Sequence, residues 1–181
     1  MLQYINSILK FSCFTINWRT RCYMKLVAYD DAYYEKIENF QINSSQLEFT
    51  NAPLDNIRLA KQNPNRHCIL GLSNQNDLVV FYVLHEDCEF TNYFSTPAES
   101  TIFIRSLSTD ERHLRKGYAR KSLERLDSYL VEHMSHIKHI ALLVDKPNQI
   151  AYQLYTSLGF KDVKVEVDND GDIQLLMEKS L

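Results

Sequence analysis

The sequence predicts one α/β domain, of the α+β kind, with a central mixed, mostly antiparallel sheet flanked by helices. Three observations favour this fold. The chain has 181 residues, a length that suits a single domain. A strand, a helix and a second strand follow one another over residues 101–144, and such a unit needs a right-handed crossover and a parallel strand pair. Two hairpins, one on each side of that unit in the chain, require antiparallel pairing.

Composition excludes several classes of protein. Hydrophobic residues make up 45% and charged residues 24% of the chain, as in soluble globular proteins and unlike disordered ones. No segment approaches the roughly 20 apolar residues that span a bilayer, so we expect no membrane association. The net charge of −3 argues against a surface that coats nucleic acid in general and leaves a local basic patch open.

Cysteine and histidine patterns argue against disulfides and metal. The four cysteines form no C-x-x-C pair, and a chain of this length does not depend on disulfide bonds. We therefore expect free thiols in a reducing, cytoplasmic environment. Three of the six histidines crowd residues 133–139, but their spacing is not that of metal ligands, so we expect no metal.

Residues 1–23 differ from the rest of the chain. They contain no acidic residue and no clean hydrophobic period. Lys10 interrupts the apolar stretch and no small-residue cleavage site follows, which is a poor fit to a secretory signal. We expect residues 1–23 to be an extension outside the fold and residues 24–181 to form the domain. A short added helix that packs on the domain is the alternative.

Apolar spacing and turn residues predict each element of the first half. The expected elements are a strand over 25–29, a helix from Asp30 or Asp31 to about residue 40, a helix over 54–62, and strands over 68–72 and 78–85. An aspartate caps the first of these helices, and Pro53 suits the first turn of the second. The polar run 73–77 separates the two strands, which predicts a hairpin.

The second half alternates strands and helices. The expected elements are a strand over 101–108, a helix over 118–135, a strand over 139–144, a helix over 149–158, and strands over 163–167 and 173–178. Leucines at helical spacing support the 118–135 helix. The sequence Asn169-Asp170-Gly171 between the last two strands is typical of a hairpin turn.

A basic loop before the 118–135 helix is the first segment that suggests chemistry. Five of the ten residues 112–121 are Arg or Lys. Cations at the start of a helix face the positive end of its dipole, which costs about 0.3–1 kcal/mol each. The arrangement suits an anion held by free backbone N–H groups, and Gly117 would let the backbone approach a phosphate closely. A phosphate site is therefore favoured over a nucleic-acid patch or an inert basic surface.

The helix over 149–158 is the second such segment. Asn148, Ala151, Tyr152 and Tyr155 are three, one and three positions apart, so they share roughly one side of this helix. Ala151 leaves a low point where a ligand could lie, and the phenol of Tyr155 could donate a proton. Half-buried packing of the two tyrosines is the alternative interpretation.

Together the two segments resemble the GNAT superfamily of acetyl-CoA-dependent N-acetyltransferases. That family carries Q/R-x-x-G-x-G/A after its fourth strand, here Leu114-Arg-Lys-Gly117-Tyr-Ala119. It also carries N-x-x-A-x-x-L-Y-x-x-x-G-F in its last conserved helix. Every named position of that motif is matched, by Asn148, Ala151, Leu154, Tyr155, Gly159 and Phe160. The likeness covers residues 24–181, and its one departure is Leu114, where the family has Gln or Arg.

The resemblance implies the GNAT fold, with a splayed parallel strand pair, and acetyl-CoA as co-substrate. The fourth strand would pair with the pantetheine arm, the loop and helix start would hold the pyrophosphate, and the last helix would line the other side. Tyr155 matches the general acid that protonates the departing thiolate. The implied cofactor-binding residues are Leu107, Ser108, Thr109, Arg112, Arg115, Lys116, Gly117, Tyr118, Ala119, Arg120, Asn148, Ala151, Tyr152 and Tyr155.

The implied reaction is direct transfer of the acetyl group to a primary amine of a small acceptor, a polyamine or an amino-acid-like molecule. An alkyl ammonium with a pKa of about 10.4 must lose a proton before it attacks. The candidate bases are Glu86, Glu89, Glu99 and His139. The segments expected to form the acceptor site, about 40–66 and 86–100, mix aromatic and acidic side chains, which suits a cationic amine.

Two other functions stay open at this point. One is a non-catalytic acyl-CoA-binding regulatory module on the same fold, which would not need the Tyr155 hydroxyl. The other is a nucleic-acid-binding module that uses the basic patch. A monomer and a homodimer are both compatible with the sequence.

Overall fold

The computed structural model describes residues 24–169 and 171–181, and the extension expected over residues 1–23 lies outside them. The strands are β1 (Met24–Ala28), β2 (Arg66–Ser73), β3 (Leu78–His85), β4 (Thr101–Thr109), β5 (His139–Asp145), β6 (Lys161–Asn169) and β7 (Asp172–Ser180). The α-helices are α1 (Tyr34–Glu38), α2 (Ser44–Leu47), α3 (Pro53–Gln62), α4 (Tyr118–His133) and α5 (Gln149–Ser157). Short 3-10 turns cover Asp31–Tyr33, Thr91–Tyr93, Ala98–Ser100 and Glu111–His113.

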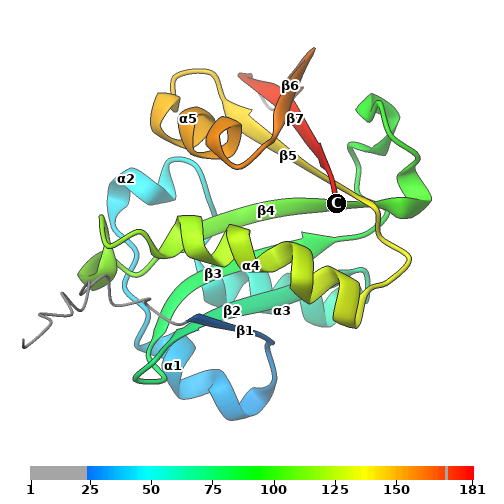
Figure 1. The fold of residues 1–181 in the computed structure, drawn as a ribbon. Coiled ribbons are helices and arrows are strands. Elements are labelled where there is room, and N and C mark those ends of the chain that lie inside the picture. The colour runs from blue at the N-terminus through cyan, green and yellow to red at the C-terminus, as the bar shows by residue number, and fades with distance from the viewer. Residues whose placement is uncertain (1–23, 170) are drawn as a thin grey trace, which may run out of the picture.

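The described strands form one sheet of seven in the order β1-β2-β3-β4-β5-β7-β6 (Figure 1). Strands β4 and β5 pair in parallel, and the other neighbours pair antiparallel. The mixed, mostly antiparallel sheet expected from the sequence is thus confirmed. The parallel pairing runs only from Thr101 with His139 to Ile104 with Leu142, although both strands continue beyond it. The pair is therefore splayed at its carboxyl ends.

Two apolar clusters cover opposite faces of the first half of the sheet. One face packs against leucines of α4 and against Tyr155 of α5, and the other packs against Ile37 of α1 and Ile57 of α3. In Figure 1, α4 crosses in front of the sheet and α3 lies behind it. Strand β3 is buried along its whole length because both of its faces are covered. This accounts for its unbroken apolar sequence.

Several elements differ from the sequence expectation in length. The helix expected from residue 30 or 31 to about 40 is a 3-10 turn followed by α1, which ends at Glu38. Asp30 does cap the start, because its carboxylate accepts a hydrogen bond from the Ala32 N–H at 2.8 Å. Helix α2 was not expected, and Asn43 caps it by accepting from the Gln46 N–H at 3.0 Å. None of the helices in the described ranges is long and apolar enough to cross a membrane.

Candidate active site

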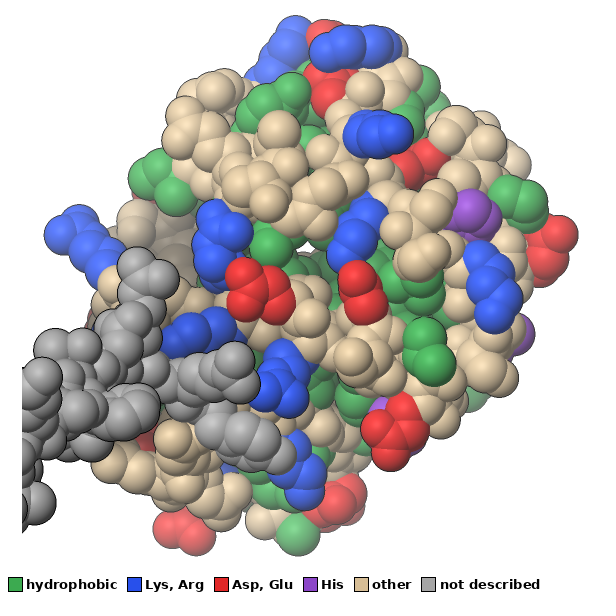
Figure 2. All heavy atoms as spheres, viewed as in Figure 1, with side chains coloured by type: hydrophobic (Ala, Val, Ile, Leu, Met, Phe, Trp, Pro, Cys, Tyr) green, Lys and Arg blue, Asp and Glu red, His purple; other side chains and the backbone are tan. Residues whose placement is uncertain are grey.

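A cavity of about 500 Å³ opens where β4 and β5 separate, and we call it the cleft cavity. Its walls come from β4, the end of β5, the loop before α4, the first turns of α4 and α5, and the α2 region. Figure 2 shows a hollow on the face that carries α4 and α5, with basic and acidic side chains around it. The cavity is lined by Asn43, Ser45, Gln46, Phe49, Thr50, Ile104, Arg105, Ser106, Leu107, Thr109, Leu114, Arg115, Ala119, Leu143, Val144, Asp145, Asn148, Ile150, Ala151, Leu154 and Tyr155.

A bulge bends β4 beside this cavity. The pairing of β4 with β3 shifts register between Phe81 and Val83, and Ser106 has a left-handed backbone with φ of 57°. A bulge of this kind turns the strand and re-aims the residues that follow it. The Ser106 hydroxyl donates to the amide oxygen of the fully buried Asn56 at 3.1 Å. Helix α3 therefore holds the bulge in place from behind the sheet.

The loop before α4 turns through two left-handed residues, Arg115 at φ 60° and Gly117 at φ 79°. Gly117 occupies the N-cap position of α4, and a Cβ at that position would meet no atom within 4 Å. The first N–H groups of a helix have no partner within the helix. Open space therefore lies beside the amides at the start of α4, as an anion site requires.

Asp110 anchors this loop to the rest of the domain. Its carboxylate is fully buried and accepts hydrogen bonds from the Gln41 N–H and from the backbone and guanidinium of Arg112. Burial by itself would raise the pKa of Asp110, but these hydrogen bonds hold it below its ordinary value. Arg112 also donates to the Asn39 carbonyl at 2.9 Å, so this arginine stabilises the loop and does not line the cleft cavity.

Helix α5 presents Tyr155 to the cleft cavity. The side chain of Asn148 caps the helix by accepting from the Ala151 N–H at 3.1 Å. Tyr155 is 8% exposed, and its ring packs edge-to-face on the ring of Phe160. Burial, with a smaller effect of the Asp145 charge, raises the pKa of Tyr155 to about 12. Its phenol is therefore protonated at every pH at which the protein would work.

The structure brings half of the implied cofactor residues together. Those that line the cleft cavity are Leu107, Thr109, Arg115, Ala119, Asn148, Ala151 and Tyr155. The others are Ser108, Arg112, Lys116, Gly117, Tyr118, Arg120 and Tyr152. Lys116 donates to the Arg112 carbonyl and Arg120 donates to the Ser157 hydroxyl, both at 2.7 Å. Tyr152 lies one position round the helix from Ala151, and its hydroxyl donates to Asp162 at 3.4 Å.

Gln46 of α2 is a contact that sequence reasoning missed. Its side-chain amide accepts from the Thr109 N–H and donates to the Thr109 carbonyl, each at 2.9 Å. The Thr109 backbone groups expected to face pantetheine are thus already bonded in this structure. The sequence did contain a signal for α2, since Asn43 followed three residues later by Gln46 resembles a capping box.

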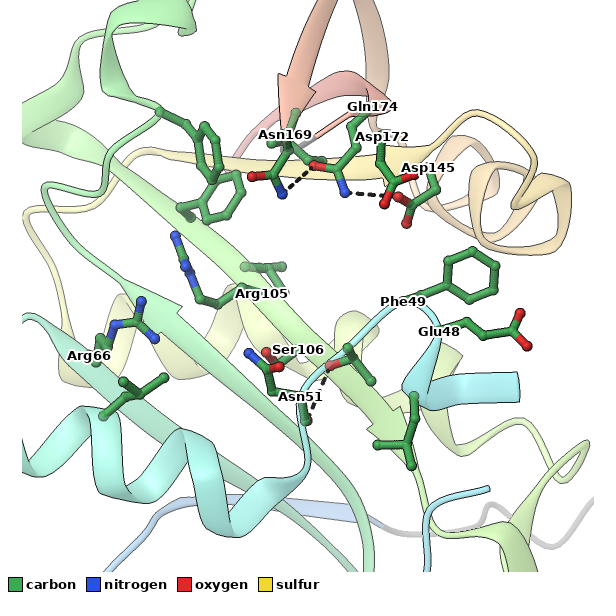
Figure 3. Close-up of a pocket in the computed structure, with 17 residues that line it drawn as sticks. Glu48, Phe49, Asn51, Arg66, Arg105, Ser106, Asp145, Asn169, Asp172 and Gln174 are labelled. Atoms are coloured by element: carbon green, nitrogen blue, oxygen red, sulfur yellow. Dashed lines mark hydrogen bonds between the residues drawn. The ribbon is translucent and has the colours of Figure 1, made fainter. Parts of the chain in front are cut away.

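A second cavity, of about 330 Å³, adjoins the first, and we call it the polar cavity. Both cavities share a wall that includes Phe49, Arg105, Ser106 and Asp145. Figure 3 shows the polar cavity bounded by the α2–α3 link, β4 and the ends of β5 and β7. The two segments expected to form an acceptor site contribute residues 47–51, Leu59, Arg66 and Phe90.

None of the four candidate bases lines either cavity. Glu86 accepts from His67 and His136, and Glu89 accepts from Arg105. His139 is paired with Ser180 near the opposite end of β5. Among the described residues, Asp145 is the one carboxylate that lines both cavities, and it accepts from Gln174 at 2.9 Å. Over the same residues, no group of three or more His, Cys, Asp or Glu side chains is arranged to hold a metal.

The fold and the cleft point to one family of enzymes, and comparison with known proteins agrees. Residues 15–160 match the profile described as the acetyltransferase (GNAT) family. The chain belongs to the GNAT acetyltransferase family. The resemblance drawn from the two sequence motifs is thus confirmed, and so is the expectation of an acyltransferase. The family uses acetyl-CoA as its acyl donor.

Individual relatives are more distant. The chain is 27% identical over 141 residues to the uncharacterized N-acetyltransferase YbbJ of Bacillus subtilis (strain 168). The matched region covers 77% of this chain and 86% of YbbJ. Spermidine N-acetyltransferase from Vibrio cholerae, solved with CoA and spermine, has a TM-score of 0.66 at 18% identity and covers 87% of this chain and 95% of that chain. An uncharacterized protein from Bacillus halodurans has a TM-score of 0.70 at 14% identity, covering 87% and 83%. These solved structures confirm the GNAT fold.

Proposed function

We propose that this GNAT protein transfers the acetyl group of acetyl-CoA directly to a primary amine of a small-molecule acceptor. The observation that supports this most is the position of Tyr155, a buried and protonated phenol in the cleft where β4 and β5 part. A polar cavity that shares a wall with that cleft would hold the acceptor. Residues 24–181 would be the catalytic domain.

The donor fits the cleft cavity on three counts. The open amides at the start of α4, with Arg115, would hold the pyrophosphate. The backbone of β4 at Leu107 would pair with the pantetheine arm, and at Thr109 it would do so once Gln46 releases that residue. Asn148, Ala151 and Tyr155 would border the thioester end. The replacement of the family's Gln or Arg by Leu114 changes one side chain, whereas most phosphate contacts in this proposal come from backbone amides, with Arg115 in addition.

Proton movements follow from the chemistry of the two reactants. The acceptor ammonium loses a proton to Asp145, directly or through water, and the free amine attacks the thioester carbon. The nitrogen of the adduct gives up a second proton to water as the carbon–sulfur bond breaks, and the thiolate leaves and takes up a proton from solvent. A thiol has a pKa of about 8.5, so full proton transfer from a phenol with a pKa of about 12 is uphill by about 5 kcal/mol. Tyr155 would therefore act chiefly through a hydrogen bond that strengthens as charge develops on sulfur.

The test is thiol release from acetyl-CoA with a panel of amines. Tyr155→Phe should lower kcat about a hundredfold, the order expected for loss of a proton donor, while the Kd for coenzyme A in calorimetry stays within about twofold. Tyr129→Phe is the matched control, because this half-buried tyrosine of α4 lines neither cavity. Equal kcat values for wild type and Tyr155→Phe would contradict the proposal.

The same experiment separates the other functions. A non-catalytic acyl-CoA-binding module would bind coenzyme A and release no thiol with any amine. A nucleic-acid-binding module would bind oligonucleotides with an affinity that falls steeply with salt. That function is disfavoured by the bonds that Arg112, Lys116 and Arg120 already make within the protein.

A further inference from the structure

Two arginines form one end of the polar cavity. Arg105 of β4 is 17% exposed, and its guanidinium lies over the rings of Phe103 and Phe90 at 5.2 and 5.8 Å. It donates to Glu89 at 2.7 Å, while its Nε is buried without a hydrogen-bond partner. This packing fixes the direction in which the guanidinium points.

Arg66, the first residue of β2, reaches the same end of the cavity and is half-buried. Within the described ranges it makes no side-chain hydrogen bond or ion pair, and Figure 3 shows it below Arg105 on the same side of the cavity. Burial, and then the neighbouring charge of Arg105, lowers the pKa of Arg66. A guanidinium nevertheless stays charged in proteins, so two cations face this end together.

The local charges do not balance. Among residues 24–169 and 171–181, Glu89 is the one carboxylate bonded to the arginine pair. His85, which pairs with Arg66 across β2 and β3, is buried, and burial with the two arginine charges lowers its pKa to about 4. It is therefore neutral at neutral pH and adds no charge. Asp87, the other acid whose charge acts on His85, is exposed and is bonded to neither arginine. At the partly desolvated wall, two guanidiniums against one bonded carboxylate leave an excess of one positive charge, which an anionic ligand group would neutralise.

The opposite end of the polar cavity has the opposite sign. Asp145, Asp172 and Glu48 line it, and Figure 3 shows the two aspartates across the cavity from the arginines. Gln174 donates to Asp145 and accepts from Asn169 at 3.3 Å, which fixes the position of the aspartate. This end adjoins the cleft cavity through the shared residue Asp145. A cationic amine held there would lie next to the thioester.

We infer that the acceptor is a small amine that also carries a carboxylate, bound with the carboxylate against Arg66 and Arg105 and with the amine at Asp145. The inference rests on the proposed function and narrows its acceptor class. The excess of one positive charge matches a singly charged carboxylate better than a doubly charged phosphate. A polyamine would place a further cation against the two guanidiniums, so it fits this cavity poorly.

Acceptor binding is measured first, by calorimetry in the presence of coenzyme A, so that the measurement does not depend on turnover. The probes are lysine, ornithine, β-alanine, γ-aminobutyrate and glycylglycine, each with its carboxamide, together with spermidine and phosphoethanolamine. At least one carboxylate should bind ten times or more tighter than its carboxamide, spermidine and phosphoethanolamine. Tighter binding of spermidine or phosphoethanolamine, or no difference between carboxylate and carboxamide, would overturn the inference.

Variants then assign the effect to the arginine pair. Arg66→Gln should raise KM at least tenfold for the preferred carboxylate acceptor, leave KM for its carboxamide within about twofold, and leave the Kd for coenzyme A unchanged. Arg66→Lys keeps the charge but loses the planar guanidinium, so its KM for the carboxylate acceptor should lie between those of wild type and Arg66→Gln. Arg58→Gln is the control, because this exposed arginine of α3 lines neither cavity and pairs with Asp55. An unchanged carboxylate preference in folded Arg66→Gln would overturn the inference.

The outcomes distinguish the inference from the proposed function. Transfer to spermidine alone would keep the transferase and overturn the carboxylate acceptor. Carboxylate binding that depends on Arg66, without thiol release from acetyl-CoA, would keep the binding site and overturn transfer. Absence of both binding and transfer would overturn both.

Discussion

The cleft cavity and the polar cavity share a wall but are built in different ways. The donor-binding groups of the cleft come from three continuous segments, the end of β4, the loop into α4 and the start of α5, and much of what they offer is backbone. The polar cavity draws its charged side chains from β2, β4, β5, β7 and the α2–α3 link. A donor that a whole family shares can be held by backbone groups, which do not depend on side-chain identity. An acceptor is selected by side chains that the fold brings together from distant positions.

The largest expected effect tests the backbone character of the cleft. Gly117→Val should weaken coenzyme A binding about a hundredfold, which is about 2.7 kcal/mol, because a branched side chain would stand where the diphosphate approaches the amides. Binding is measured by calorimetry. Gly171→Val in the β6–β7 turn is the matched control, since both glycines have a positive φ and open space around the missing Cβ. A similar loss of affinity in both variants would show that backbone strain, and not phosphate contact, is responsible.

The second prediction concerns the cationic end of the polar cavity. Because the folded pKa of His85 is about 4 and an unfolded histidine has a pKa of about 6.5, the unfolded state binds the extra proton between these values. Stability should therefore fall as the pH drops from 6.5 towards 4, and by pH 5 this group alone should remove about 2 kcal/mol.

Urea unfolding of wild type and His85→Asn at pH 7 and pH 5 measures this contribution. The pH-dependent loss should be smaller in the variant by about 2 kcal/mol, since asparagine does not titrate. Equal losses in the two proteins would mean that the arginine pair and burial do not hold His85 neutral.

The smallest expected effect lies in the wall of the cleft cavity, at Gln46. Gln46→Ala removes two hydrogen bonds to Thr109 and should lower the stability of the free protein by about 1–2 kcal/mol. If pantetheine takes over the Thr109 backbone groups, coenzyme A should raise the Tm of the variant more than that of wild type. Thermal unfolding with and without coenzyme A measures both. An equal rise in Tm would show that pantetheine does not use Thr109.

The sequence predicted the mixed sheet, helices α4 and α5 and the residues of the two motifs because their signals are local. Leucines at helical spacing predicted α4, and Gly117 and Asn148 lie at the helix starts where the motifs require them. The candidate bases could not be predicted from local sequence, because their partners lie far away in the chain. Glu86 and Glu89 are acidic residues in the expected segments, but each is bonded to a partner from another strand or loop, and neither lines a cavity.

By itself, the sequence determined the family, the order of the strands and the donor motifs, because each depends on residues close together in the chain. Only the tertiary structure decided which side chains face the acceptor. Arg66 and Asp145 are about eighty positions apart and belong to no motif, and they line one cavity because β4 and β5 part after Ile104 and Leu142. Strand pairing and its interruption are long-range events, so the charges they bring together leave no pattern in the sequence.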